Sequence, residues 1–202
     1  MSEDGERDEV VDDAAKRGSN LWAGLGMLVL GMLVLPFGGL FVYGYFLPEA
    51  YDVEVSGTVN APQAALWKTL TEPELQGEWR PGVGQHELAD PIDGQPVVVL
   101  HTGEARLTLQ RTEMVPEERV VWTVVPSKKH VYVGSWSFDL APAGDGATHV
   151  TVTEHGEINS AFARAATHAF FGLRSYSEAS IGALGVYHEV DVSLDPESGP
   201  TD

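Results

Sequence analysis

Two charged side chains continue strand faces that are otherwise apolar, and they are the best candidates for chemistry in this sequence. Arg111 extends the alternation of Leu107 and Leu109, and Glu154 extends that of Val152. A charge on an inward face is costly unless it is paired or hydrogen-bonded. We therefore consider that Arg111 holds a carboxylate or phosphate head group, and that Glu154 acts as a general base or binds a ligand hydroxyl.

A structural role is the alternative that we favour for both groups. Arg111 and Glu154 can lie at strand ends where the face reaches solvent, or they can pair with each other. Tyr176, on the apolar stripe of a helix, can offer its hydroxyl to a ligand or satisfy a backbone carbonyl. The residue types alone do not decide between these roles.

Other kinds of reaction centre are missing from the sequence. There is no cysteine, so no thiolate nucleophile or Cys-ligated metal is expected. His149 and His155 share a strand face but stand about 20 Å apart, too far for one ion. His101 with Glu104 is at best a two-ligand fragment, and no HExxH, GxSxG, GxGxxG or P-loop motif occurs. We predict no metal ion and no cofactor.

The charge balance excludes one class of partner. The 202 residues include 30 acidic and 12 basic ones, for a net charge of −18. Proteins that bind nucleic acid concentrate Lys and Arg on one face, so no nucleic-acid partner is expected. Docking to anionic lipid through a basic patch is disfavoured for the same reason. With 43% apolar residues, the chain can nevertheless bury a core.

The inward faces of the strands and of the last helix predict an apolar interior with aromatic walls. Such an interior suits a hydrophobic small molecule or an acyl chain, although the same side chains can simply fill a core. The predicted lining residues are Leu107, Leu109, Arg111, Trp122, Trp136, Phe138, Val152, Glu154, Ala169, Leu173 and Tyr176.

Residues 21–46 form an uncharged run that predicts one transmembrane helix. A helix of 26 residues is about 39 Å long, against a hydrocarbon core of about 30 Å. Trp22 at one end and Tyr43 and Tyr45 at the other fit interfacial aromatic belts. A signal peptide would be shorter, and a core helix would show a polar face. Residues 21–46 are thus the expected contact with the membrane.

Basic residues and charge runs predict the orientation and the tails. Lys16 and Arg17 precede the apolar run, so the N-terminus is expected in the cytoplasm and residues 47–202 outside the cell membrane. Residues 1–20 and 191–202 carry seven and four acidic side chains and are expected to be disordered tails.

Apolar periodicity predicts the order of elements behind the anchor. Residues 51–58 alternate as a strand, Asn60 is positioned to cap a helix, and a second short helix follows at 72–79. Six strands divided by turn residues are expected between 86 and 155. A long helix then starts at the capping residue Ser160, with Arg164 and Arg174 facing away from its apolar stripe.

This order of elements is similar to the helix-grip fold of the START/Bet v 1-like (SRPBCC) superfamily, in its polyketide cyclase/dehydrase and lipid-transport branch. The matching pieces are VEVSGTVNAPQAALWKTLTEPELQGEWRPGV, LTLQRTEMVPEERVVWTV and GSWSFDLAPAGDGATHVTVTEHGEI. The resemblance implies an α+β domain over residues 47–190, in which a seven-stranded antiparallel sheet grips the long C-terminal helix. It also implies a ligand cavity between sheet and helix.

The leading functional hypothesis is a membrane-anchored domain that binds or shuttles a hydrophobic small molecule or lipid without catalysis. The alternative is a cyclase- or dehydratase-like enzyme that uses Glu154 as general base, with Arg111 or Tyr176. A third hypothesis is a scaffold whose cavity is filled by its own side chains. The resemblance identifies the fold rather than the activity, and the sequence gives no indication of the oligomeric state.

Overall fold

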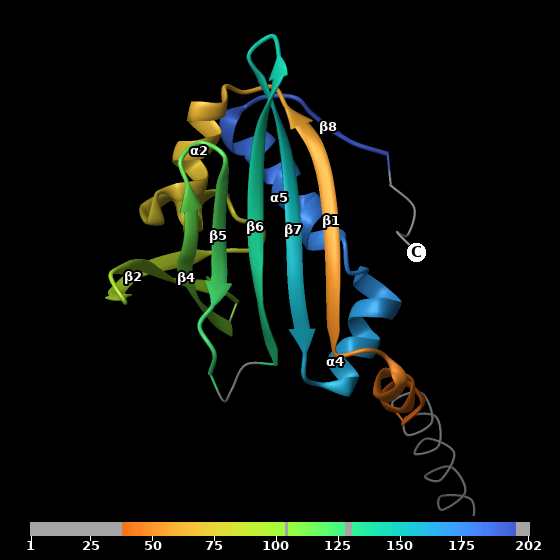
Figure 1. Cartoon of the computed structure of the whole chain (residues 1–202). Helices are drawn as coiled ribbons and strands as arrows, with labels where there is room; N and C mark the ends of the chain where they lie inside the picture. The colour runs from red at the N-terminus through yellow and green to blue at the C-terminus, as the bar shows by residue number, and fades with distance from the viewer. Residues whose placement is uncertain (1–37, 104, 128–130, 197–202) are drawn as a thin grey trace, which may run out of the picture.

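The architecture is one antiparallel sheet of eight strands, in the order β2-β3-β4-β5-β6-β7-β1-β8. The computed structural model describes residues 38–103, 105–127 and 131–196 (Figure 1). The strands are β1 Ala50–Val59, β2 Gln85–Ile92, β3 Gln95–Thr102, β4 Ala105–Val115, β5 Arg119–Val124, β6 Tyr132–Gly144, β7 Ala147–Ile158 and β8 Val192–Leu194. The expected α+β helix-grip class is thereby confirmed.

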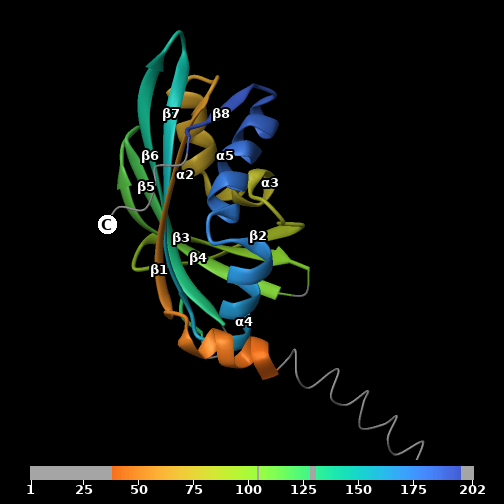
Figure 2. The ribbon, with the colours of Figure 1, turned by 90° about the vertical axis from the view of Figure 1, so that its right-hand side faces the viewer.

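Helices cover one face of this sheet, as Figure 2 shows. The first group connects β1 to β2 and comprises α2 Gln63–Thr71, the 3-10 turn η1 Pro73–Leu75 and α3 Gln76–Trp79. The second group follows β7 and comprises α4 Ala161–Ala166, the π-helical turn η2 Thr167–Phe171 and α5 Ser175–His188. A further helical stretch, residues 38–46, precedes β1.

The core lies between the sheet and these helices because the strands alternate. In β1, Val53, Val55 and Val59 are buried, and in β7 Val150 and Val152 are buried on the same face. Leu66 and Leu70 of α2 and Ile181 and Leu184 of α5 belong to the same core cluster. Period-two burial on the strands therefore places one side-chain face of each strand against the helical layer.

The sheet has one strand more than the seven expected. Val192–Leu194, in the segment expected to be a disordered tail, pair with β1 as β8, with Gly57 opposite Leu194. A Cβ at Gly57 would lie 2.9 Å from the carbonyl oxygen of Ser193, so glycine is needed for this approach. The added strand covers backbone groups of β1 that would otherwise form an open sheet edge.

The C-terminal helix is broken, which corrects the prediction of one long helix. Ser160 caps α4 as expected, because its Oγ accepts a hydrogen bond from the Ala163 N–H. After the π-helical turn, Gly172 adopts φ 76° and stops the helix, and α5 starts three residues later. A positive φ of this kind suits glycine and cannot continue a right-handed helix.

Two further expectations about local structure are wrong. Asn60 does not cap α2, whose N-cap is Pro62 without a side-chain bond, and the Asn60 N–H instead donates to the carbonyl of Asp191. Arg164 does not face away from the protein but is buried. Both residues join parts of the chain that lie far apart in sequence, which periodicity does not reveal.

The predicted membrane span lies mostly outside the described residues. Residues 1–20 and 21–37 belong to the part that the structure does not describe. Within 38–103, 105–127 and 131–196, no helix is both long and apolar enough to cross a membrane.

Candidate functional site

Glu154 is a buried carboxylate in the middle of β7, and three hydroxyl groups donate hydrogen bonds to it. Only 3% of the surface of Glu154 is exposed. The hydroxyls of Tyr51 and Tyr132 lie 2.6 and 3.1 Å from Oε1, and that of Ser177 lies 3.3 Å from Oε2. These donors come from β1, β6 and α5, so the carboxylate links three elements. Both of its oxygens have a hydrogen-bond donor.

Two glycines make room for the tyrosines that reach Glu154. Gly134 of β6 and Gly156 of β7 are cross-strand partners. A Cβ at Gly156 would collide with the ring of Tyr51, and one at Gly134 would lie 2.6 Å from the hydroxyl oxygen of Tyr132. The paired glycines therefore leave a bare patch of sheet over which both tyrosine side chains extend toward the carboxylate.

The surroundings keep both tyrosines protonated. Burial raises the pKa of Tyr51 and of Tyr132 far above the usual value, and the neighbouring Glu154 raises both further. A tyrosinate beside a buried carboxylate would bring two negative charges together in a poorly solvated place. At neutral pH these hydroxyls thus act as hydrogen-bond donors to Glu154.

Arg80 is another buried charge, and it lies just after α3. Its residue is 3% exposed. Nε donates to Oε1 of Gln76 at 3.0 Å, and Nη1 donates to the Tyr176 hydroxyl at 3.3 Å. The guanidinium carbon is 4.9 Å from the ring centroid of Trp79 and 5.5 Å from that of Phe138, as in cation–π contacts. Among the described residues no carboxylate forms an ion pair with Arg80.

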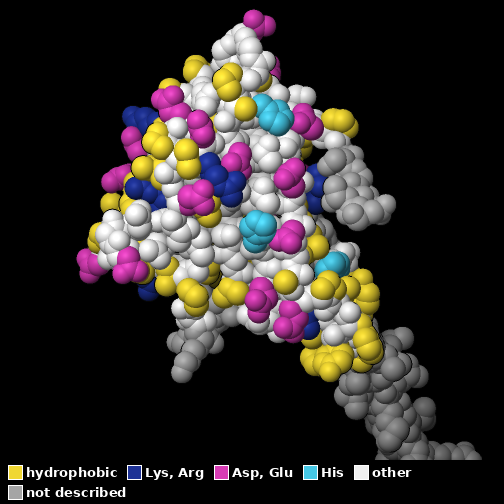
Figure 3. Space-filling view, viewed as in Figure 1, with side chains coloured by type: hydrophobic (Ala, Val, Ile, Leu, Met, Phe, Trp, Pro, Cys, Tyr) yellow, Lys and Arg dark blue, Asp and Glu magenta, His cyan; other side chains and the backbone are white. Residues whose placement is uncertain are grey.

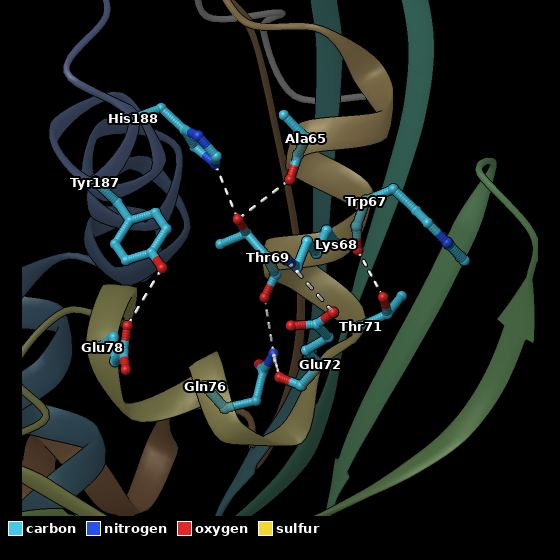
Figure 4. A network of polar contacts seen from close by, with 10 residues as sticks. All are labelled: Ala65, Trp67, Lys68, Thr69, Thr71, Glu72, Gln76, Glu78, Tyr187 and His188. Atoms are coloured by element: carbon cyan, nitrogen blue, oxygen red, sulfur yellow. Dashed lines mark hydrogen bonds and ion pairs between the residues drawn. The ribbon is translucent and has the colours of Figure 1, made fainter.

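Gln76 fixes the position of Arg80 and is itself held by the end of α2 (Figure 4). Its Nε2 donates to the carbonyl oxygens of Thr69, Leu70 and Glu72 at 3.0, 3.0 and 3.1 Å. These bonds satisfy orphan carbonyls at the helix C-terminus and assign the amide orientation. Oε1 of Gln76 is therefore the oxygen that remains to accept from Arg80.

Aromatic rings connect the two buried charges. Tyr132 stacks on Trp136 with ring centroids 5.4 Å apart, and Trp136 contacts Tyr176 at 5.2 Å. Tyr132 bonds Glu154 at one end of this tract, and Tyr176 bonds Arg80 at the other. The tract gives an apolar wall between a carboxylate and a guanidinium.

Four buried polar atoms near this tract and α2 have no hydrogen-bond partner among the residues that the structure describes. They are Nε1 of Trp79, Nη2 of Arg80, Nε of Arg111 and Nε1 of Trp136. All four carry N–H groups and can only donate. Buried polar groups are nearly always paired in folded proteins, so an unpartnered group needs an explanation. An acceptor oxygen, from a ligand or a water molecule, would complete these groups.

Arg111, the first sequence candidate, is positioned by α2 rather than by Glu154. Its Nη1 donates to the carbonyl of Thr71 at 3.0 Å, and partial burial lowers its pKa. Trp122 acts in the same place, because its Nε1 donates to the carbonyl of Leu70 at 2.9 Å. Both side chains satisfy the C-terminal end of α2. Of the alternatives that the sequence left open, neither a pairing of Arg111 with Glu154 nor a solvent-open strand end for Glu154 is found among the described residues.

The remaining predicted lining residues fall into three groups. Leu109, Trp136, Phe138 and Val152 are buried, Leu107, Leu173 and Tyr176 are partly buried against the core, and Ala169 is exposed in η2. Ala169 leaves the predicted stripe because the π-helical turn shifts the helix register there. Ala169 therefore lies outside the core, and its place in a ligand lining stays a prediction.

Periodicity along the chain did not reveal the residues that surround the two charges. Arg80 has the position of a helix end, and Tyr51, Tyr132 and Ser177 occupy ordinary strand and helix positions. The available signal was the pair Trp79–Arg80, an aromatic and a cation next to each other at a helix end. Only the folding of α3 onto β6 and α5 brings it opposite Tyr176.

Comparison with known proteins gives a family and a fold. A family model described as polyketide cyclase / dehydrase and lipid transport matches residues 50–189. No curated protein is similar enough in sequence to count as a match.

Solved structures support the same fold. The ZhuI aromatase/cyclase from Streptomyces sp. R1128 superimposes with a TM-score of 0.58 at 18% identity, over 69% of this chain and 94% of that one. A START superfamily protein from Mycobacterium smegmatis gives 0.53 at 14%, over 68% and 97%. Norcoclaurine synthase from Thalictrum flavum gives 0.53 at 11%, over 69% and 93%. At these identities the likeness shows the fold alone.

Proposed function

The chain belongs to the polyketide cyclase/dehydrase and lipid-transport family, and from that premise we propose that its helix-grip domain binds a hydrophobic small molecule with an oxygen acceptor at one end. The proposal rests on one observation, the buried N–H groups of Arg80, Trp79 and Trp136, which have no hydrogen-bond partner among the described residues. A carboxylate, or a ketone or enolate oxygen, is the chemistry that would complete them. Binding or shuttling without catalysis is the function that this arrangement supports best.

Energetic considerations support an acceptor as the missing partner. A buried donor without a partner costs about 1–3 kcal/mol, and an unpaired buried charge costs more. The Arg80 guanidinium carbon lies 4.9 Å from the centroid of the Trp79 ring, so one oxygen-bearing group has two open donors, Arg80 Nη2 and Trp79 Nε1, in the same region. The rings of Trp136, Tyr176 and Phe138 supply apolar surface for the rest of the ligand.

The test compares ligands that differ only in the acceptor. The full chain is titrated with 2-naphthoate and 2-methylnaphthalene, and with oleate and (Z)-heptadec-8-ene, a hydrocarbon without an oxygen acceptor, and binding is measured by calorimetry and thermal shift. We expect each carboxylate to bind more tightly than its uncharged relative. The pair with the larger difference indicates whether the natural ligand is aromatic or an acyl chain. Mass spectrometry of solvent extracts from the purified protein identifies any ligand that stays bound.

Variants assign the effect to Arg80. Arg80→Met should weaken carboxylate binding about tenfold or more and leave the uncharged relatives unaffected. Arg119→Met is the matched control, because Arg119 bonds Asp139 on the exposed side of the sheet. Equal binding of carboxylate and uncharged probes would contradict the proposal. No binding of any probe, together with an empty extract, would support the scaffold with a filled interior.

Cyclase or dehydratase catalysis is the second candidate, with Glu154 as general base. The aromatic tract that joins Glu154 to Arg80 is the observation in its favour, since it could hold a substrate between a base and a cation. The three hydroxyl donors favour the binding function, because Glu154 would have to lose some of these hydrogen bonds before it could accept a proton from a substrate. Turnover of a bound ligand that Glu154→Gln abolishes would favour the enzyme.

We also propose that residues 21–46 anchor the domain to the cell membrane, with the N-terminus in the cytoplasm. The uncharged run and the position of Lys16 and Arg17 support this topology. The chain has no cysteine, so a single introduced cysteine is the only site that a maleimide can label. An impermeant maleimide applied to intact cells should label Ala143→Cys in the β6–β7 hairpin but not Ser2→Cys. The reverse pattern would invert the topology, and labelling of neither or both would contradict the anchor in this orientation.

A further inference from the structure

The helix at residues 38–46 is packed against the domain rather than attached as a loose tether. Gly44 is buried, and a Cβ there would collide with the carbonyl of Ala161 and lie 3.0 Å from Cβ of Ala165. Only glycine permits this close approach of the helix to α4. Figure 1 shows the helix beside α4 at one end of the sheet.

Arg164 fixes this contact from inside. The residue is 4% exposed. Its Nε donates to the carbonyl of Gly44 at 3.0 Å, and its Nη1 donates to the carbonyl of Ile158 at 2.8 Å and to Glu49 at 3.0 Å. Separating helix 38–46 from α4 would remove a hydrogen-bond acceptor from the buried Arg164 guanidinium, which is strongly unfavourable. The direction of helix 38–46 relative to the sheet is therefore set by the fold.

Exposed aromatic side chains concentrate on the two helical segments that meet here. We call the following set the aromatic face: Phe41, Tyr45 and Phe46 on helix 38–46, and Phe162, Phe170 and Phe171 on residues 161–171, each between 43% and 80% exposed. Figure 3 shows hydrophobic side chains gathered over helix 38–46 and α4. An exposed apolar surface of this kind marks an interaction site on a folded domain.

Resting on the membrane anchor proposed above, we infer that the aromatic face is seated in the lipid interface of the same membrane, so that the domain lies on the bilayer in one orientation. Helix 38–46 ends the uncharged run 21–46, so the face is continuous with the segment expected in lipid. Phe, Tyr and Trp favour the membrane–water boundary. The net charge of −18 makes the contact hydrophobic rather than electrostatic, and it predicts no need for anionic lipid.

Seating this face on lipid would bring the ligand site close to the membrane. α5 starts at Ser175, four positions after Phe171, and its first turn carries Tyr176 and Ser177. These two side chains bond Arg80 and Glu154. The first turn of α5 therefore connects the seated face to the two buried charges of the proposed ligand site.

The experiment measures depth in lipid with single-cysteine labels on the full chain. Phe171→Cys, Leu30→Cys and Val186→Cys are each labelled with an environment-sensitive fluorophore and reconstituted into phosphatidylcholine vesicles that contain brominated lipids. Leu30 lies in the predicted span, and Val186 is a matched control that is 80% exposed on α5. We expect strong quenching at positions 30 and 171 and several-fold weaker quenching at 186.

The other outcomes separate this inference from the proposals on which it rests. Quenching at position 30 alone would overturn the seating of the aromatic face and leave the anchor intact. Quenching at none of the three positions would contradict the anchor and the inference together. Naphthoate binding, measured on the same samples, reports the ligand site independently of both.

Substitution of the face gives a second readout. Phe170→Ser combined with Phe171→Ser should reduce quenching of a label at Phe162→Cys, because the neighbouring side chains that enter lipid are lost. The control pair Leu88→Ser with Val186→Ser removes two exposed apolar side chains elsewhere and should leave that quenching unchanged. An equal loss of quenching in both pairs would contradict a specific role for this face.

Discussion

Glu154 and Arg80 are two charges buried to the same degree, and they differ in how completely they are satisfied. Glu154 receives hydrogen bonds from three hydroxyl groups on three elements. Arg80 bonds a neutral amide and a phenol, and one of its nitrogens has no partner. The first arrangement fastens β1, β6, β7 and α5 together. The second leaves donors open in the interior, which is typical of a site prepared for a ligand.

The comparison predicts the largest loss of stability at Glu154. Glu154→Leu should lower the free energy of unfolding by about 3–5 kcal/mol, because three buried hydroxyls lose their acceptor at once. Glu154→Gln keeps the shape and one oxygen, so we expect a smaller loss. Denaturant unfolding of both variants measures the difference. A loss below that of an exposed substitution such as Glu118→Gln would show that the carboxylate does not join these elements.

Alkaline pH should act on the same cluster. An unfolded tyrosine loses its proton near pH 10, whereas folded Tyr132 keeps its own to higher pH because burial and Glu154 raise the pKa. Above about pH 10 the unfolded chain binds fewer protons, so the free energy of unfolding falls by about 1 kcal/mol per pH unit for such a group. Below that pH the contribution is fully present.

Denaturation curves from about pH 8 to about pH 11 check this dependence. Tyr132→Phe should flatten the decline above pH 10, and the exposed Tyr45→Phe should not. An identical decline in both variants would contradict the protected tyrosine.

Two buried tryptophans differ in whether the indole N–H has a hydrogen-bond acceptor. Trp122 donates to the Leu70 carbonyl, and Trp136 donates to no described atom. Phenylalanine removes the N–H in either place. We expect Trp122→Phe to cost about 1 kcal/mol more than Trp136→Phe, the net value of one hydrogen bond. Thermal unfolding of the two variants without ligand measures this difference in stability. A larger loss in Trp136→Phe would contradict the distinction between satisfied and open donors.

The smallest effect on stability is expected at Arg80. Arg80→Met replaces an unpaired buried charge by an apolar side chain of similar length, so the free energy of unfolding should stay within about 1 kcal/mol or rise. Carboxylate binding should be lost in the same variant. A loss of several kcal/mol would instead make Arg80 a structural residue equivalent to Glu154.

The strands and their inward faces were predictable because burial on a sheet repeats every two residues. In the structure, burial alternates along β1 at Val53 and Val55 and along β7 up to Glu154, as the sequence predicts. The break at Gly172 was not predicted, because an apolar stripe with a single glycine fits a continuous helix as well. β8 was missed because Val192–Leu194 are too few residues for periodicity to stand out among acidic neighbours.

The family, the order of strands β1 to β7 and the inward position of Glu154 and Arg111 follow from the amino-acid sequence, because they depend on spacing along the chain. The contacts of each charge, in contrast, depend on the packing of the folded chain. Arg111 meets the end of α2, Glu154 meets Tyr51 and Tyr132, and Arg80 meets Tyr176 across 96 positions. Hydrogen bonds act over about 3 Å in space whatever the separation in sequence. The partners of a buried charge are therefore set by how the elements pack.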